Sequence, residues 1–223
     1  MEFKFKNWNT GIELTSDNIN SIKFDNKKDF YEFISYASNE KEADEWFNVY
    51  EDNKSHNFVS ICKVLVDLFN VDLNDKKIIN ALYKVITKDS LDQETTNQIS
   101  TINTEISNLI DGKLQNYNFP IIYDSNLDIA AFLKMCDVQF NFDNKDLLTK
   151  MTNYIDILLE FTSYKVLLIP HLYQLLDENQ IKELISYIAN KNLYIISCIT
   201  KDNNAIPNKK IIDEQKDEID III

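Results

Sequence analysis

The sequence predicts an α/β fold in which a parallel-sheet head carries an inserted all-α arm. Two apolar runs in the last third, residues 165–170 and 193–198, lack the alternation of a half-exposed strand. Such strands, joined by a helix of about 14 residues, are typical of a parallel βαβ unit buried on both faces. The middle third shows only helical periodicity, and the first third again contains short strands. We therefore predict a discontinuous head of residues 1–58 and 144–223, with residues 59–143 as the helical arm.

Short strands and one helix account for the first third of the chain. Alternating apolar residues indicate strands, whereas Phe30, Phe33 and Ile34 recur at the spacing of one helix face. In chain order we expect a hairpin of residues 2–6 and 11–15, a strand at 20–24, a helix at 26–38, a strand at 46–50 and a polar loop at 51–57.

Apolar residues spaced by three and four continue through the middle of the chain and predict four helices. These helices are expected at residues 59–68, 75–86, 91–117 and 124–136. The longest carries a narrow apolar stripe on an otherwise polar surface, which favours an extended arm or a helix–helix partner over a deeply buried helix. The stripe is formed by Ile99, Ile102, Ile106, Leu109, Ile110 and Leu114.

The last third completes the parallel unit. A helix at residues 144–162 precedes the first apolar strand, and Asp177 with Gln180 forms a capping-box pattern at the start of the connecting helix. That helix places Ile181 and Leu184 on one apolar face. The final residues, EIDIII, are again typical of a strand.

The composition excludes several classes of function. The net charge is −13, and all 23 cations are lysines because the chain has no arginine. An arginine finger, a bidentate guanine contact and a fixed carboxylate clamp all require a guanidinium group. Gly11 and Gly112 are the only glycines, so no glycine-rich phosphate-binding motif is present. We therefore expect no nucleotide-dependent catalysis, and we expect asparagine to fill left-handed turn positions in place of glycine.

The cysteines and histidines predict neither a disulfide framework nor a zinc site. Cys62, Cys136 and Cys198 are scattered among apolar residues, which is typical of reduced thiols in a cytosolic protein. His56 and His171 lie far apart in the sequence, and no CxxC pair completes a ligand set. The first residues lack an apolar leader, and no apolar run reaches the ~20 residues of a membrane helix. We expect a cytoplasmic protein that has no membrane segment and binds no nucleotide.

His171 is a candidate for catalysis because it follows a buried strand. Open parallel sheets bind ligands beyond the carboxyl ends of their strands. A P-loop enzyme would have an acidic residue there to hold magnesium, but this strand is followed by Pro170 and His171. No nucleophile or orienting carboxylate accompanies the imidazole in the sequence, so a structural loop histidine is the favoured interpretation.

Two further groups of residues have both a functional and a structural interpretation. Asp124 and Asp128 lie four residues apart at the start of a predicted helix. Their carboxylates could hold calcium, or they could oppose the helix dipole. Lys27, Lys28 and Lys54 could face a polyanion if the cations gather on one surface, or they could be solvated surface lysines.

The order of these elements resembles a known family. The resemblance depends on three segments. The first contains two short predicted helices joined at residues 71–74. In chain order the segments are SICKVLVDLFNVDLNDKKIINALYKVI, YDSNLDIAAFLK and SYKVLLIPHLYQLLDENQIKELISYIANKNLYIISCIT. From about Ser21 onward the chain is similar to the small spacer-acquisition protein of type II-A CRISPR systems, the Csn-two family. The resemblance rests on element order, hydrophobic texture and these segments, not on a catalytic signature.

The resemblance implies a non-enzymatic DNA-binding protein. Members of the family have an α/β head related to P-loop ATPases but without nucleotide motifs, and they form ring-shaped homotetramers. The ring holds calcium and passes double-stranded DNA through a lysine-lined hole without reading its sequence. The resemblance implies Asp124 and Asp128 as calcium ligands, although the segment NYNFPIIYDS is less acidic than expected there. It also implies that Lys27, Lys28 and Lys54 face the DNA. The implied partners are the CRISPR integrase and effector nuclease proteins.

Two alternatives stay open at this point. One is a protein–protein adaptor with the same fold and no direct DNA contact, which the net charge of −13 favours. The other is an enzyme that uses His171.

Overall fold

The computed structural model describes residues 1–142, 145–200, 209–212 and 218–221. The chain forms two compact units, which we call the head (Met1–Val71 with Asp143–Ile223) and the arm (Asp72–Phe142). The α/β fold expected from the sequence is confirmed. The arm begins at residue 72, whereas the sequence suggested residue 59, because the intervening residues contribute a strand to the head sheet.

The head contains a six-stranded sheet in the order β10-β9-β3-β8-β7-β6. Every neighbouring pair is parallel except β10 and β9. The strands are β3 (Ile19–Phe24), β6 (Cys62–Val64), β7 (Val166–Pro170), β8 (Tyr194–Ile199), β9 (Lys209–Ile212) and β10 (Glu218–Ile221). Strands β7 and β8 are the two apolar runs, and their pairing confirms the parallel unit. All five residues of β7 are buried, which explains why its sequence does not alternate.

A second, antiparallel sheet in the head has the order β2-β1-β4-β5. Its strands are β1 (Glu2–Phe5), β2 (Ile12–Glu13), β4 (Phe47–Glu51) and β5 (Lys54–Asn57). The expected polar loop at residues 51–57 was wrong, because β4 and β5 form a hairpin there. Its two turn residues, Asp52 and Asn53, have φ of 50° and 61°. Positive φ at both central residues matches the twist of a tight hairpin, and Asn and Asp tolerate it without glycine.

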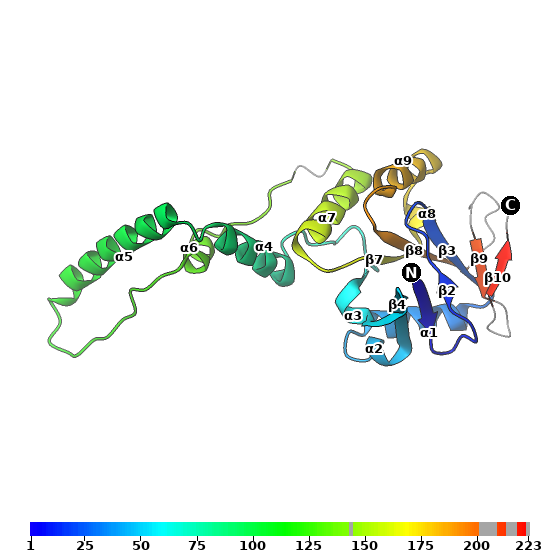
Figure 1. The fold of residues 1–223 in the computed structure, drawn as a ribbon, viewed down its shortest axis with the longest axis horizontal. Helices are drawn as coiled ribbons and strands as arrows, with labels where there is room; N and C mark the ends of the chain where they lie inside the picture. Colours follow the sequence, from blue (N-terminus) through cyan, green and yellow to red (C-terminus); the bar gives the residue numbers. More distant parts are fainter. Residues whose placement is uncertain (143–144, 201–208, 213–217, 222–223) are drawn as a thin grey trace. The chain divides into compact units, whose positions relative to one another are not determined.

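The head helices cover both faces of the large sheet (Figure 1). Helix α1 (Lys27–Ser38) lies on one face with the small sheet, and α7 (Leu147–Phe161) and α9 (Glu178–Ile188) lie on the other. Short helices α2 (Ala43–Trp46), α3 (Phe58–Ile61) and α8 (Leu172–Leu175) complete the unit. The capping box at the start of α9 is confirmed: the Asp177 carboxylate accepts the Gln180 backbone N–H, and the Gln180 side chain accepts that of Asp177.

Strand β6 corrects the helix expected at residues 59–68. Residues 58–61 form one helical turn, and the chain then extends so that β6 pairs with β7 in parallel. Short apolar runs fit a strand or a helix equally well by spacing alone, and the neighbouring strand decides between them. Here the edge of the buried β7 strand provides backbone groups that β6 satisfies.

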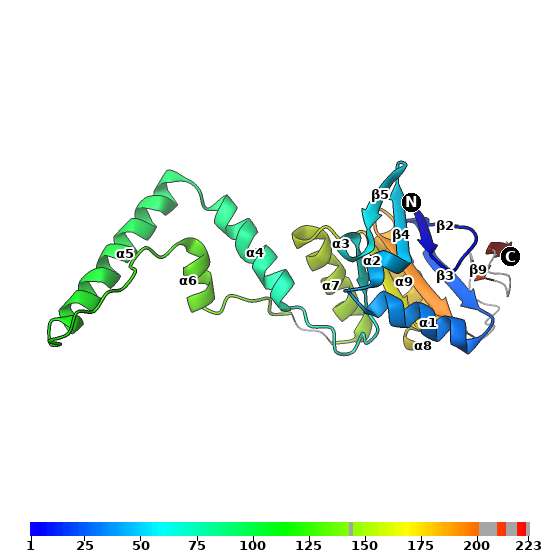
Figure 2. The same cartoon turned by 90° about the horizontal axis from the view of Figure 1, so that it is seen from below.

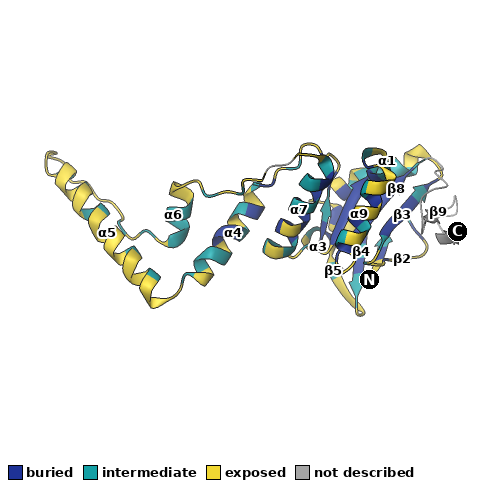
Figure 3. Ribbon diagram, turned by 90° about the horizontal axis from the view of Figure 1, so that it is seen from above, coloured by how far each residue is buried: buried dark blue, intermediate teal, exposed yellow. Residues whose placement is uncertain are grey.

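The arm consists of α4 (Lys76–Asp89), α5 (Gln93–Leu114) and α6 (Ile129–Met135). An aspartate side chain caps each helix, namely Asp75, Asp92 and Asp128. Helix α5 has no buried residue (Figure 3), so its narrow apolar stripe is covered only in part. Among the described residues, no helix has both the length and the apolar character needed to cross a membrane.

Candidate functional site

The carboxyl edge of the parallel sheet is the edge at which open α/β sheets bind ligands. Helix α1 begins directly after β3, and the Asn26 side chain caps it by accepting the backbone N–H of Asp29 at 2.8 Å. The Asn26 amide also donates to the Asp29 carboxylate at 2.7 Å. An acidic side chain in the first turn of α1 repels a phosphate that the helix N-terminus would otherwise attract.

His171 lies at the same edge and is held by structural contacts. Its backbone is left-handed, with φ of 63°, and its N–H donates to the Cys198 carbonyl at 3.3 Å. Its ring lies 5.0 Å from the ring of Phe30. The imidazole Nδ1 is buried without a hydrogen-bond partner. Burial raises the pKa of the nearby Cys198 thiol far above its usual range, so that thiol is no nucleophile at neutral pH.

The three lysines singled out in the sequence are exposed on the head. Lys27 and Lys28 begin α1, and Lys54 begins β5 beside the hairpin turn. No described carboxylate forms an ion pair with any of the three, and no described contact joins Lys54 to the other two. The structure therefore supplies two separate cationic positions on the head.

A small charge network beside Lys54 was not visible in the sequence. Glu51 is the cross-strand partner of Lys54, but its carboxylate accepts a 2.6 Å hydrogen bond from Lys165. That bond holds the pKa of Glu51 below its usual value. His56 Nε2 lies 3.9 Å from the same Glu51 oxygen. Because Lys165 already offsets Glu51, Lys54 keeps its own charge available to an anion.

Asp124 and Asp128 lie in the arm, and each is engaged with backbone. Asp128 caps α6 by accepting the Ala131 N–H at 2.8 Å, and Asp124 accepts the Asn126 N–H at 2.9 Å. Helix α6 starts at Ile129, five residues later than the sequence suggested. The interpretation in which these acids serve a helix start therefore has direct support for Asp128.

The described part of one chain does not complete a calcium site. Nowhere in that part do three or more His, Cys, Asp or Glu side chains gather in a way that could hold a metal ion. Calcium takes roughly six to eight oxygen ligands. Asp124 and Asp128 each accept a backbone N–H with one carboxylate oxygen, so an ion there would need further oxygen ligands besides these two side chains.

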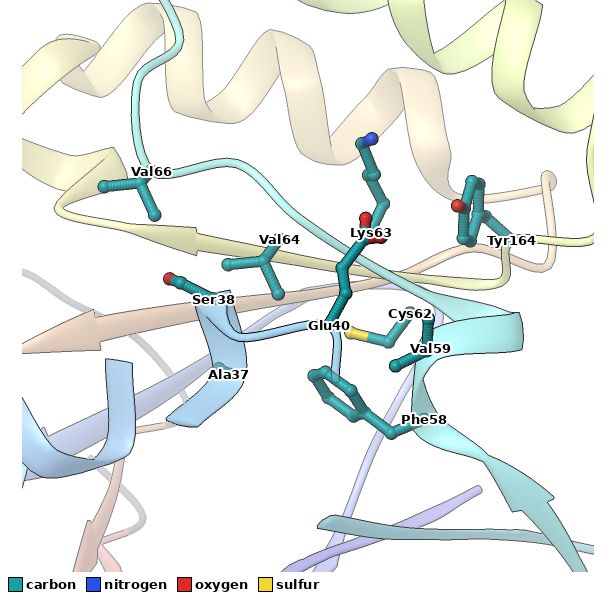
Figure 4. Close-up of a pocket in the computed structure, with 10 residues that line it drawn as sticks. All are labelled: Ala37, Ser38, Glu40, Phe58, Val59, Cys62, Lys63, Val64, Val66 and Tyr164. Atoms are coloured by element: carbon teal, nitrogen blue, oxygen red, sulfur yellow. The ribbon is translucent and has the colours of Figure 1, made fainter. Parts of the chain in front are cut away.

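A cavity of about 220 Å³ opens beside the edge strand β6 of the head (Figure 4). Its walls are Ala37, Ser38, Glu40, Phe58, Val59, Cys62, Lys63, Val64, Val66 and Tyr164. Lys63 lies over the Tyr164 ring, 5.9 Å from its centroid. Burial raises the pKa of the Cys62 thiol well above its usual value. The cavity contains none of the candidate residues and offers no activated nucleophile.

Comparisons with known proteins identify a family for the chain. A family model described as "CRISPR-associated protein (Cas_Csn2)" matches residues 35–217. No curated protein is significantly similar to the chain.

Solved structures of similar fold include two ATP-binding proteins. One is the ATP-binding cassette MJ0796 in a dimeric post-hydrolysis state with ADP and phosphate. It is 12% identical to this chain, the match covers 97% of this chain and 96% of that chain, and the TM-score is 0.42. The other is a putative ABC transporter ATP-binding protein from Pyrococcus furiosus, at 6% identity, 95% and 97% coverage and a TM-score of 0.40. Similarity of this degree supports no conclusion about function.

Proposed function

The chain belongs to the CRISPR-associated Cas_Csn2 family, and we propose that it is a non-enzymatic protein that binds double-stranded DNA during spacer acquisition. The match covers most of the chain and confirms the resemblance seen in the sequence. The observation that carries DNA binding is the pair of exposed lysines at the start of α1, with Lys54 as a second position, none of them in an ion pair with a described carboxylate.

Lysine-only cations support binding without sequence readout. Phosphate oxygens attract any ammonium group, whereas guanine is read best by the arginine fork. The chain has 23 lysines and no arginine. With a net charge of −13, binding requires that lysines gather on the surface that meets DNA, and a ring of four copies would bring them together around a lumen. We therefore include the homotetrameric ring in the proposal.

The same observations support a head that acts as a scaffold and not as an enzyme. The Asn26 side chain at the start of α1 is bonded to Asp29, and His171 lies against Phe30 without a described nucleophile beside it. Calcium binding by Asp124 and Asp128 stays a prediction, and no step of the proposed function depends on the ion. The integrase and effector nuclease proteins of the CRISPR system are the proposed partners.

A mobility shift with linear and sealed circular duplex of the same length tests the proposal, in calcium and again in chelator. We expect a shift of the linear form that weakens steeply as salt rises, because phosphate contacts release counterions. Each lysine that contacts a phosphate contributes about 0.9 to the slope of log affinity against log salt. The variant Lys27→Gln/Lys28→Gln should therefore lower that slope and weaken binding several-fold.

Lys182→Gln is the matched control, because Lys182 is an exposed lysine on α9 of the same unit. It should leave the slope unchanged. A protein that shifts neither form of DNA at low salt is an adaptor, and DNA binding is then excluded. Turnover of DNA that disappears in His171→Ala would instead establish the enzyme alternative.

A further inference from the structure

The arm exposes far more large apolar side chains than the head does. Of the 13 such side chains among residues 1–142 and 145–200, 10 lie in the 71 residues of the arm. They are Leu91, Ile102, Leu109, Tyr117, Phe119, Ile121, Ile122, Tyr123, Met135 and Phe142. An apolar surface of this density, exposed in one copy, is typical of a protein–protein contact.

The arm also contains a pocket with apolar walls and a cationic rim. It lies between α4 and α6, measures about 520 Å³, and is lined by Asn80, Tyr83, Lys84, Thr87, Lys88, Leu91, Ala130 and Lys134. The Tyr83 hydroxyl donates to the Val138 carbonyl at 3.0 Å and lies 3.4 Å from that of Leu133. These bonds fasten α6 and the following loop to α4, so the pocket is formed within one folded unit.

Tyr83 apart, the charged groups and the threonine hydroxyl that line this pocket have no partner in the described structure. Lys84, Lys88 and Lys134 are exposed, and no described carboxylate pairs with them. The Thr87 hydroxyl is buried without a hydrogen bond. A buried hydroxyl without a bond is costly, so it favours an occupant that supplies one. An occupant that satisfies the pocket has an apolar anchor, a negative charge and an available backbone group.

The segment that follows α5, residues 116–128, has these features and is fixed in place by hydrogen bonds to α5. Ile122 is 96% exposed, and the segment 116–128 contains two carboxylates and no lysine. The Tyr123 hydroxyl donates to Asp111 at 2.7 Å, and the Asn103 amide donates to the Leu127 carbonyl at 2.9 Å. Both bonds fix the segment on α5, while the Ile122 side chain stays exposed. A segment fixed before binding loses less conformational entropy when it docks.

We propose that the pocket between α4 and α6 receives Ile122 of a second copy, with the Asp124 carboxylate of that copy facing Lys84 and Lys88. The inference rests on the self-association included in the proposed function and names the surfaces that meet. In this contact the Asp124 carboxylate pairs with lysines of the other copy and does not bind calcium. DNA is a poorer occupant, because a phosphate backbone gains nothing from apolar walls.

Charge reversal tests the contact by sedimentation velocity of the full-length protein across a range of concentrations. Lys84→Glu/Lys88→Glu places acids against Asp124, and Asp124→Lys places a cation against lysines. Each variant alone should associate about tenfold or more weakly than the natural chain, since like charges replace a complementary pair. Lys113→Glu, a single charge reversal on α5, is the control and should associate like the natural chain.

Mixing the two charge-reversed variants should restore association. In a reciprocal pair, the reversed pocket faces the introduced lysine, and the natural pocket of the other chain faces the natural Asp124. Both contacts are therefore complementary. If neither variant weakens association, or if the mixture does not recover it, the proposal is wrong. A natural chain that stays monomeric at every concentration also overturns it.

Covalent cross-linking provides a readout that does not depend on charge. Ile122→Cys and Leu91→Cys are introduced into separate chains in a Cys136→Ser background. Cys62 and Cys198 are buried and do not compete. A bismaleimide should link the two chains in the mixture, whereas Leu109→Cys mixed with Leu91→Cys should not link. A linked product with Leu109 and none with Ile122 would assign the contact to another surface.

Chelator and DNA separate this inference from the proposed function. Association through the lysine pocket should persist in EDTA, and dissociation to monomers there would assign Asp124 to calcium and overturn the inference. If Lys84→Glu/Lys88→Glu weakens DNA binding but leaves association unchanged, the pocket lysines face nucleic acid. Failure of Lys27→Gln/Lys28→Gln to affect DNA affinity would contradict the DNA site while leaving the sedimentation result intact.

Discussion

The head and the arm are stabilised by different kinds of contact. In the head, aromatic rings pack between the two sheets: Phe33 has ring centroids of Phe5, Trp8, Phe24 and Phe47 within 5.4 Å. In the arm, α5 buries no residue, and its described contacts are caps and hydrogen bonds near the surface. The head therefore carries its own core, whereas the arm leaves much of its apolar surface exposed. Figure 2 shows the two units with their helices labelled.

The largest difference should appear when one apolar side chain is removed from each unit. Phe33 is 0% exposed and Leu109 is 65% exposed. Phe33→Ala creates a cavity in the aromatic cluster and should lower the free energy of unfolding by about 3–5 kcal/mol. Leu109→Ala should change it by less than about 0.5 kcal/mol. Urea unfolding of both variants measures the contrast, and equal losses would contradict it.

Helix caps sharpen the comparison at a smaller scale. Asp177 caps α9, which packs on the head sheet, so Asp177→Ala should lower the global free energy of unfolding by about 1 kcal/mol. Asp92 caps α5, which has no buried residue. Asp92→Ala should reduce helical circular dichroism through fraying without moving the urea midpoint. The control Asp177→Asn keeps a capping oxygen and should retain most of the stability.

Acid should weaken the Glu51–Lys165 pair in the head. The hydrogen bond from Lys165 lowers the pKa of Glu51 in the folded chain relative to the unfolded chain. A lowered carboxyl pKa contributes stability that is present above the unfolded value and is lost as pH falls through the folded value. Lys165→Gln should remove this part of the acid dependence, worth under about 1 kcal/mol. Thermal melts of both proteins between neutral pH and pH 3 measure this acid dependence. If Lys165→Gln has the same dependence of melting temperature on pH as the natural chain, the pair does not contribute to stability.

The smallest effect on stability is expected for Asp128→Asn in the arm. Asparagine caps a helix about as well as aspartate, so α6 should persist and the urea midpoint should not move. The variant loses one carboxylate charge, so any calcium-dependent stabilisation should decrease if Asp128 is a ligand. Melts in calcium and in EDTA, compared with Asp137→Asn as an exposed control, decide this point.

The sequence predicted the elements whose signals are local. The capping box at Asp177, the buried strands β7 and β8 and the start of α1 at Asn26 depend on adjacent residues, and the structure has them where the spacing indicated. Left-handed positions occupied by Asn53 and Asn192 also followed from the scarcity of glycine. Local patterns determine these features because near neighbours along the chain satisfy their hydrogen bonds.

The sequence could not predict features that depend on distant partners. Residues 62–64 become a strand because β7, a hundred residues later, offers a paired edge. The Glu51–Lys165 hydrogen bond joins residues 114 positions apart. The lysine-rimmed pocket of the arm lies where the Tyr83 hydroxyl of α4 donates to the Val138 carbonyl, 55 positions later in the chain. No spacing rule connects residues that are brought together by the fold.

The sequence by itself determined the α/β class, the helical insertion and a cation set made only of lysine, because composition and short-range periodicity carry that information. Only the tertiary structure decided where the arm begins, that β6 pairs with β7, and which apolar side chains stay exposed. The physical reason is that burial, pairing and pocket shape are set by contacts between segments far apart in the chain, which local patterns do not encode.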